Sequence, residues 1–271
     1  MRFNLWLIIV LAISSCAAYK SFAPAALQSS AESEVIPSPC VPPGWKTGDS
    51  VVFGWVYPCL DDQGLRERVQ AVALSGSIEA SKILAHYYAF KDDSTEKAIF
   101  WYRNAISINA TCISTRAQLS RLLVERGSSS EEVAEGVSIA AETAMEGETG
   151  TMSLLVAHYR SKGEWENVIR YERMLAYSGD LIAMIDLSKN LLKGWSKAAD
   201  SSLEACAWLD VARERSAPGS WLAKQVESLR GKLLRNSNAI NLTACKSRAT
   251  DLRSALATAA SRNTVEIKAC E

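Results

Sequence analysis

The fold is decided by the stretch Gly179–Gly194, with the sequence GDLIAMIDLSKNLLKG, and by Leu203–Ala212, with the sequence LEACAWLDVA. In the first stretch, Ala183, Leu187 and Leu191 stand four residues apart, so one face of a helix carries all three. The second stretch has the same helical periodicity and ends in a small alanine, next to which another helix can pack closely. Together the two stretches predict a pair of packed helices.

This pattern recurs along the chain, and its late alanines stand at intervals of 35 to 36 residues. Each copy has a small residue, then a leucine four residues later, then an aromatic residue or leucine after four more, and a late alanine on the next helix. The small residues are Ala80, Thr115, Thr151 and Ala183, the leucines are Leu84, Leu119, Leu155 and Leu187, the third row is Tyr88, Leu123, Tyr159 and Leu191, and the late alanines are Ala105, Ala140, Ala176 and Ala212. A period of this length predicts an all-α fold, a helix-pair solenoid of about four repeats.

The first and last copies resemble the Sel-one-like repeat, a relative of the tetratricopeptide repeat. The residues that carry the resemblance are Gly76, Ala80, Leu84-Ala85, Tyr88, Lys97-Ala98, Trp101-Tyr102 and Ala105 in the first copy, and Gly179-Asp180, Ala183, Leu187, Leu191-Leu192, Gly194, Ala205, Trp208-Leu209 and Ala212 in the last. The middle copies carry Gly136 and Glu172 in place of the tryptophan. The repeat array is predicted at residues 61–217. Residues 218–271 are predicted to hold capping helices, at Ser220–Lys232 and Ile240–Ala260.

The amino terminus resembles a bacterial export signal. Arg2 precedes the apolar run Leu5–Ile13, which is too short to cross a bilayer, and Ile13-Ser14-Ser15-Cys16 resembles a lipobox. The resemblance implies a signal peptide over residues 1–15 and an acylated Cys16. Ala17, with no aspartate after the cysteine, implies a periplasmic protein on the outer membrane. A secretory signal cut after Ala17 or the next alanine is the alternative. Residues 16–38, rich in Ala, Ser and Pro, suit a flexible tether.

The chain has seven cysteines, and six remain when the acylated residue is set aside. Export to an oxidising compartment makes disulfides plausible. Two bridges are predicted: Cys40–Cys59, closing a Pro- and Gly-rich strap at residues 39–60, and Cys245–Cys270, around the last helix. Cys112 and Cys206 fall in helical patterns and are predicted to be buried thiols.

The sequence shows no recognisable catalytic set. Gly48-Asp49-Ser50 resembles the nucleophile block of one lipase and esterase family, but that family's Asp-x-x-His near the carboxyl terminus is missing, so we predict a turn there. His86 and His158 hold nearly equivalent repeat positions, which accounts for their likeness and places them too far apart to share a metal ion. We therefore expect no enzyme activity, no cofactor and no metal site.

Composition limits the partners. The 271 residues include 30 basic and 30 acidic side chains, so no net field favours nucleic acid, and 48% hydrophobic residues suffice for a large core. A solenoid exposes an extended surface, which favours binding to one protein partner. The resemblance implies an immunity protein that inhibits a toxic effector such as a lipase, because exported Sel-one-like lipoproteins include such inhibitors. A scaffold or adaptor of an envelope complex is the alternative, and an enzyme with an unrecognised site around Pro39–Cys59 is the second alternative.

The related tetratricopeptide pattern also implies where the partner binds, because in that pattern the first helix of each pair lines the concave side and its inward positions stand at fixed offsets from the leucine. These positions are Lys82, His86, Arg121, Glu125, Arg160, Ser161, Lys189 and Lys193. One acid stands there against five lysines and arginines, which favours a partner with an acidic surface and salt-sensitive association. The alternative is that these are ordinary solvated charges. Four tryptophans in loops or at helix starts are further candidates for exposure: Trp45, Trp55, Trp165 and Trp195.

Overall fold

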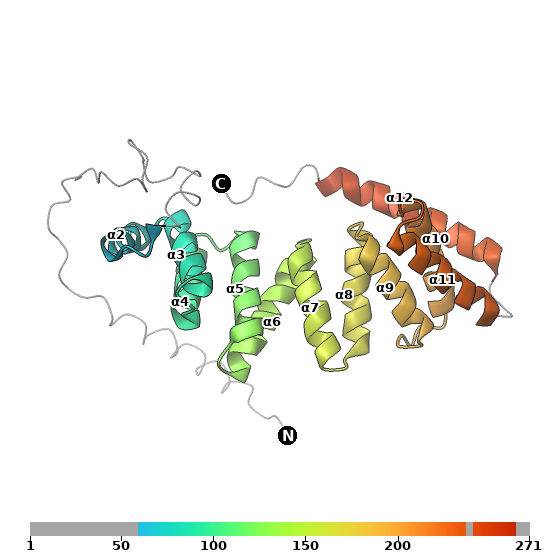
Figure 1. The fold of residues 1–271 in the computed structure, drawn as a ribbon, viewed down its shortest axis with the longest axis horizontal. Helices are drawn as coiled ribbons and strands as arrows, with labels where there is room; N and C mark the ends of the chain where they lie inside the picture. Colours follow the sequence, from blue (N-terminus) through green and yellow to red (C-terminus); the bar gives the residue numbers. More distant parts are fainter. Residues whose placement is uncertain (1–58, 237–240, 264–271) are drawn as a thin grey trace, which may run out of the picture. The chain divides into compact units, whose positions relative to one another are not determined.

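The computed structural model describes residues 59–236 and 241–263, which belong to one compact unit of the chain, Gly44–Glu271. This part is entirely helical (Figure 1). Its helices are α2 (Gln63–Leu74), α3 (Ile78–Phe90), α4 (Thr95–Ile108), α5 (Ile113–Arg126), α6 (Ser130–Met145), α7 (Thr149–Ser161), α8 (Trp165–Tyr177), α9 (Leu181–Leu192), α10 (Ser201–Arg215), α11 (Trp221–Asn236) and α12 (Leu242–Asn263). The predicted all-α fold is confirmed.

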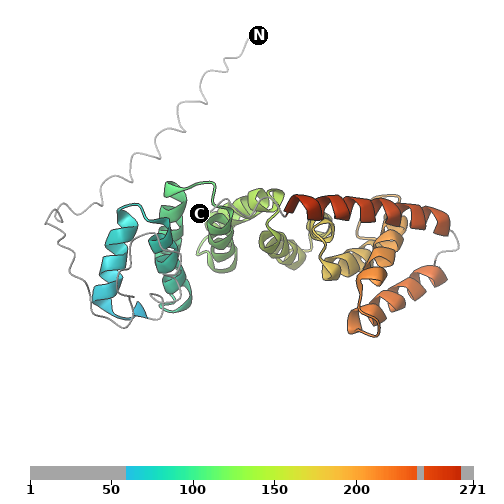
Figure 2. The same cartoon turned by 90° about the horizontal axis from the view of Figure 1, so that it is seen from above.

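Helices α3 to α10 form four antiparallel pairs, which follow one another in chain order (Figures 1 and 2). Each first helix packs most extensively on the second helix of its own pair, and each second helix then packs on the first helix of the next pair. We call α3, α5, α7 and α9 the first helices, and α4, α6, α8 and α10 the second helices. This neighbour-to-neighbour packing defines a solenoid.

The repeated residues form the core of the pairs, as the sequence predicts. The four leucines of the row that begins at Leu84 are at most 2% exposed, and the four late alanines of the row that begins at Ala105 are at most 1% exposed. Alanine at these positions lets two helix backbones approach closely, and the leucines fill the space between them. The 35–36-residue period therefore reports the spacing of real helix–helix contacts.

Local sequence signals place the helix starts. The side chains of Ser77 and Asp180 cap α3 and α9 by accepting a hydrogen bond from a backbone N–H three residues further on. Just before each cap, Gly76 and Gly179 have φ angles of +107° and +96°, which only glycine adopts without strain. The glycine therefore ends one helix and reverses the chain, and the capping residue begins the next helix.

In the second pair, where Gly136 stands in place of the tryptophan, the two helix backbones approach each other closely. A Cβ atom built on Gly136 would lie 2.7 Å from the Cβ atom of Leu123, a distance that real Cβ atoms do not reach. In the first and last pairs, Trp101 and Trp208 occupy this position and are 6% and 0% exposed. Glycine in α6 thus replaces a large buried ring by bringing the two helix backbones together.

Helix α2 is half a pair. Ala73 stands as far before Leu84 as Ala176 does before Leu187, and both alanines are buried. α2 packs on α3 as a second helix packs on the following first helix. The helical array of the described residues therefore begins with a second helix.

The two predicted capping helices are present, and they fold back on the end of the array. α11 contacts α9 and α10, whereas α12 lies along α8 and α10, as Figures 1 and 2 show. One apolar core joins the last pair to both caps and includes Trp208, Val226 and Leu252. The second helices of the last two pairs are therefore covered by α12.

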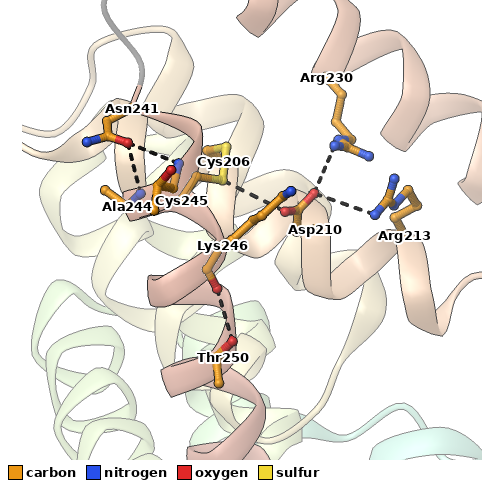
Figure 3. Close-up of a disulfide and its surroundings, with 10 residues drawn as sticks. Cys206, Asp210, Arg213, Arg230, Asn241, Ala244, Cys245, Lys246 and Thr250 are labelled. Carbon is orange, nitrogen blue, oxygen red and sulfur yellow. Dashed lines mark hydrogen bonds and ion pairs between the residues drawn. A yellow bond between two sulfur atoms is a disulfide. The ribbon is translucent and has the colours of Figure 1, made fainter.

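The cysteine pairing around these caps corrects the sequence prediction. Cys206 of α10 and Cys245 of α12 form a disulfide, drawn in Figure 3, so the predicted Cys245–Cys270 bridge is wrong and Cys206 is not a thiol. The reason is that α12 packs alongside α10 in the same direction, so that Cys206 meets Cys245 and, further along both helices, Glu214 pairs with Arg253, although each pair is 39 residues apart in sequence. The cysteine nearest in sequence was therefore the wrong choice of partner for Cys245.

Cys112 is a buried thiol, as predicted, and its sulfur accepts a hydrogen bond from the Thr115 hydroxyl. Cys59 is disulfide-bonded, in agreement with the predicted strap. Its predicted partner Cys40 lies outside the described residues. So do the signal peptide, Cys16, the tether, nearly all of the strap with Trp45 and Trp55, the Gly48-Asp49-Ser50 turn, and Cys270.

Candidate functional site

Each first helix exposes one row of side chains at helical spacing, on the side turned away from its own pair. We call these rows the first-helix stripes. They consist of Glu79, Lys82, His86 and Phe90 on α3, of Ser114, Gln118, Arg121 and Glu125 on α5, of Thr149, Ser153, Ala157 and Arg160 on α7, and of Ile182 and Asp186 on α9 with Lys189 and Lys193 after them. α12 packs mainly on the second helices α8 and α10, and the residues of the stripes are exposed or half-buried.

The structure places every predicted contact residue on or beside a stripe. Arg121, Glu125, Lys189 and Lys193 are exposed, as are Arg160 and Ser161 at the end of α7, whereas Lys82 and His86 are half-buried. Lys82, Arg121 and Lys189 form no ion pair with another described residue. Their charges therefore remain available to a partner.

The stripes carry less net positive charge than the contact positions taken from the tetratricopeptide pattern suggested. Glu79 and Asp186 lie on the same stripes, and the prediction did not include them. Burial also lowers the pKa of His86, which favours its neutral form near pH 7. Acidic and basic side chains therefore alternate on α3 and α9. The remaining excess of positive charge sits mainly at the carboxyl end of α9, where Lys189 and Lys193 stand.

Arg160 has a structural role as well. Its Nη2 atom lies 2.8 Å from Oε1 of Glu172, a carboxylate that is only 1% exposed. Asn190 of α9 donates to both oxygens of the same carboxylate, at 2.8 and 2.9 Å. Burial raises the pKa of Glu172, and the hydrogen bonds from Asn190 and Arg160 oppose that rise. This network around the buried carboxylate ties α7, α8 and α9 together where the first and last pairs place a tryptophan.

The sequence pattern marked the Glu172 position as exceptional but did not reveal its partners. Asn190 falls between two leucine positions of α9 and belongs to neither repeated row, so nothing in the repeat distinguishes it from a solvent-exposed residue. Its burial to 5% follows from the contact between α8 and α9.

Two tryptophans extend the charged end of the α9 stripe. Trp165, the first residue of α8, stacks on Trp195 in the segment after α9, with ring centroids 3.6 Å apart. The Lys193 ammonium group lies 4.0 Å from the centroid of the Trp195 ring. Both rings are half-buried, so the sequence-based suggestion of exposure holds only in part. The cluster joins the third and fourth pairs and leaves a mixed aromatic and cationic edge beside Lys193.

No group of three or more His, Cys, Asp or Glu side chains suited to a metal ion occurs within residues 59–236 and 241–263. None of the helices described there is long and apolar enough to cross a membrane.

Comparisons with known proteins bear on the fold. No protein-family model matches the chain, and no curated protein matches it. A solved structure does match: a protective antigen present in uropathogenic Escherichia coli strains, described as displaying an SLR fold, a fold of Sel-one-like repeats. The two are 20% identical with a TM-score of 0.50, over 83% of this chain and 50% of the antigen, so this chain spans about half the antigen's length. The chain thus has the helical-repeat architecture that its sequence predicts.

Proposed function

We propose that this chain binds one protein partner through its first-helix stripes. The observation that carries the proposal is that α12 packs mainly on the second helices α8 and α10, while the stripe residues of the first helices are exposed or half-buried, including those of α9, which α11 also contacts. A repeat array of this kind offers an extended surface to a protein rather than a pocket to a small molecule. The likeness in fold to a Sel-one-like repeat antigen agrees with this use of the surface.

The partner surface is proposed to be acidic at the point where it meets α9. Lys189 and Lys193 project from the last two turns of that helix, next to the Trp165–Trp195 cluster. Aromatic side chains and exposed cations are the groups that dominate binding energy in many interfaces. Such a contact accelerates capture of an oppositely charged surface and weakens as salt is added.

The finer role that we propose is that of an immunity protein, which inhibits a secreted toxic effector by direct contact in the periplasm, at the outer membrane. Its support is the export-like amino terminus and the resemblance to exported Sel-one-like lipoproteins. A scaffold of an envelope complex uses the same surface. A toxic effector encoded next to this chain, and neutralised by it in a growth assay, supports immunity, while neighbouring cell-wall genes support the scaffold.

A charge-reversal experiment tests the stripes. Once affinity capture has identified the partner, Arg121→Glu combined with Lys189→Glu is expected to weaken binding at least roughly tenfold at low salt, because both side chains would repel an acidic surface. The melting temperature is expected to stay unchanged, since both side chains are exposed and outside the ion pairs of the described residues. Isothermal titration calorimetry measures the affinity.

The matched control carries the same charge change on the caps. Lys224→Glu combined with Arg248→Glu alters exposed residues of α11 and α12, away from the first helices. This control is expected to bind as tightly as the unchanged protein. Equal weakening in both double variants would mean a general effect of net charge, and full affinity of the stripe variant would place the binding surface elsewhere.

A further inference from the structure

A small pocket lies at the far end of the array, beside the disulfide that joins α10 to α12. Its volume is about 140 Å³. It is lined by Cys206, Asp210, Arg230, Leu233, Leu234, Leu242, Cys245 and Lys246. Figure 3 shows the bridge between Cys206 and Cys245 with Asp210, Arg230 and Lys246 grouped next to it. The pocket is separate from the first-helix stripes, because its walls come from α10, α11 and α12.

The apolar wall of the pocket has the size of one side chain. Leu233 is buried, whereas Leu234 and Leu242 are 53% and 52% exposed. Two half-exposed leucines beside a cavity leave apolar surface in contact with water, which an incoming apolar group would cover. A cavity of about 150 Å³ is large enough to hold a benzene molecule, so this pocket suits one leucine-sized or phenylalanine-sized side chain.

The polar wall contains a carboxylate with an unused acceptor. The Asp210 side chain is only 8% exposed, and its Oδ1 atom lies 2.9 Å from Nη2 of Arg230 and 4.0 Å from Nη2 of Arg213. Despite these ion pairs, no hydrogen bond to Oδ1 has suitable geometry. Oδ1 is almost entirely enclosed, so Asp210 holds the Arg230 guanidinium at the pocket wall and is not itself open to a ligand.

The rim of the pocket is cationic. Lys246 is exposed on α12, and Arg230 is partly exposed while it faces Asp210 and, at 3.9 Å, Glu227. Because Asp210 is already matched by Arg230, Lys246 supplies a charge that a neighbouring acidic group on a ligand can meet. Apolar depth and a cationic rim together describe the complement of a short peptide that carries one apolar and one acidic side chain.

We propose that this pocket binds an extended segment of a partner protein, taking one apolar side chain that is followed by an acidic residue. The apolar side chain enters between Leu234 and Leu242, and the acidic residue meets Lys246. The pocket thus gives the protein a second contact point, which does not depend on the first-helix stripes.

The test uses the purified full chain and short probes. Leucine methyl resonances are followed by NMR during titration with the capped tetrapeptide Ala-Leu-Glu-Ala, and separately with Ala-Leu-Lys-Ala and Ala-Ala-Glu-Ala. The first peptide is expected to shift the Leu233, Leu234 and Leu242 methyl signals in a saturable way at millimolar concentration, a range typical of contacts this small. The other two peptides are expected to shift them several-fold less.

Two variants complete the test. Leu234→Ser combined with Leu242→Ser is expected to abolish the Leu233 shift, while Leu74→Ser combined with Met145→Ser, at leucine and methionine side chains that are each 66% exposed elsewhere, leaves it intact. Lys246→Glu is expected to invert the preference towards the lysine peptide. An unmoved Leu233 signal with Ala-Leu-Glu-Ala, or equal shifts with all three peptides, would overturn the proposal. Because no partner protein is involved, either result leaves the stripe proposal to its own test.

Discussion

Glu172 marks the place where one residue changes how a helix pair is held together. In the first and last pairs a buried indole fills this position, whereas here a buried carboxylate receives hydrogen bonds from Asn190 and Arg160. Removing one partner of such a network leaves a buried charge poorly compensated, which is usually more costly than never having had the network. The third pair is therefore held by polar contacts that depend on protonation.

The dependence of these contacts on protonation can be tested by measuring protein stability at different pH values. Burial raises the pKa of Glu172 above the ordinary glutamate value of 4.5. The folded protein then holds this proton more tightly than the unfolded chain, so the stabilisation is complete below about pH 4.5 and is lost as pH rises through the raised pKa. The difference in unfolding free energy between the unchanged protein and Glu172→Gln is expected to fall from pH 4.5 towards neutrality.

Urea denaturation at several pH values measures this difference, and comparison with the Gln variant cancels the other carboxylates. A difference that grows with pH would show that the charge attraction of Arg160 outweighs the burial of Glu172.

A second residue-scale prediction concerns the leucine row. Leu187 is 0% exposed at the contact between the helices of the fourth pair, so Leu187→Ala is expected to lower the unfolding free energy by about 2–5 kcal/mol. Ile182 on the same helix is 58% exposed, and Ile182→Ala is the control, expected to change stability by less than about 0.5 kcal/mol. Equal losses in the two variants, measured by chemical denaturation, would mean that the helix is rotated.

The buried rows of leucine and alanine could be predicted because the repeat shows the same pattern of burial in several copies. Each leucine and late alanine is confirmed by its counterparts in the other copies, and the structure buries all of them. The Glu172–Asn190 contact occurs once, between two helices, so no second copy reports it. The helical spacing located the stripes. Their net charge was not predicted correctly, because the positions taken from the tetratricopeptide pattern do not include Glu79 and Asp186.

At the scale of elements, α12 is held to α10 by a disulfide that could not be predicted from how close the cysteines are in sequence. Six cysteines allow many pairings, and only the packing of α12 alongside α10, in the same direction, selects the observed one. A signal was present nonetheless: Cys245, Ala249, Leu252 and Leu256 follow helical spacing and are all buried, so the row itself places Cys245 on the inner face of α12.

Removal of the disulfide is expected to loosen α12 selectively. Cross-linking residues 39 positions apart restricts the unfolded chain by about 4 kcal/mol on the chain-entropy estimate, and native disulfides commonly contribute about 2–4 kcal/mol. Cys206→Ser combined with Cys245→Ser should therefore lower stability by this amount, with faster amide hydrogen exchange in α12 and little change in α3. Unaltered protection of α12 would show that its apolar face alone holds it.

At the scale of the whole molecule, the proposed anchor gives a direct test. Acylation of Cys16 would hold the chain on a membrane, since each buried methylene of an acyl chain contributes about 0.8 kcal/mol. Cys16→Ser is expected to move the protein from the membrane fraction to the soluble periplasmic fraction. Cys112→Ser is the control and is expected to leave the partition unchanged. Membrane association of the Cys16→Ser variant would argue for another means of attachment.

The link between α10 and α12 also has a mechanical consequence. Tension applied between the two ends of the chain passes from Cys206 to Cys245 through the sulfur–sulfur bond, so α11, which lies inside the closed loop, carries no load. The 39-residue loop corresponds to about 130 Å of extended chain that stretching cannot release. The carboxyl-terminal end of the array therefore yields its full length to a pulling force only after a reductant has opened the bond.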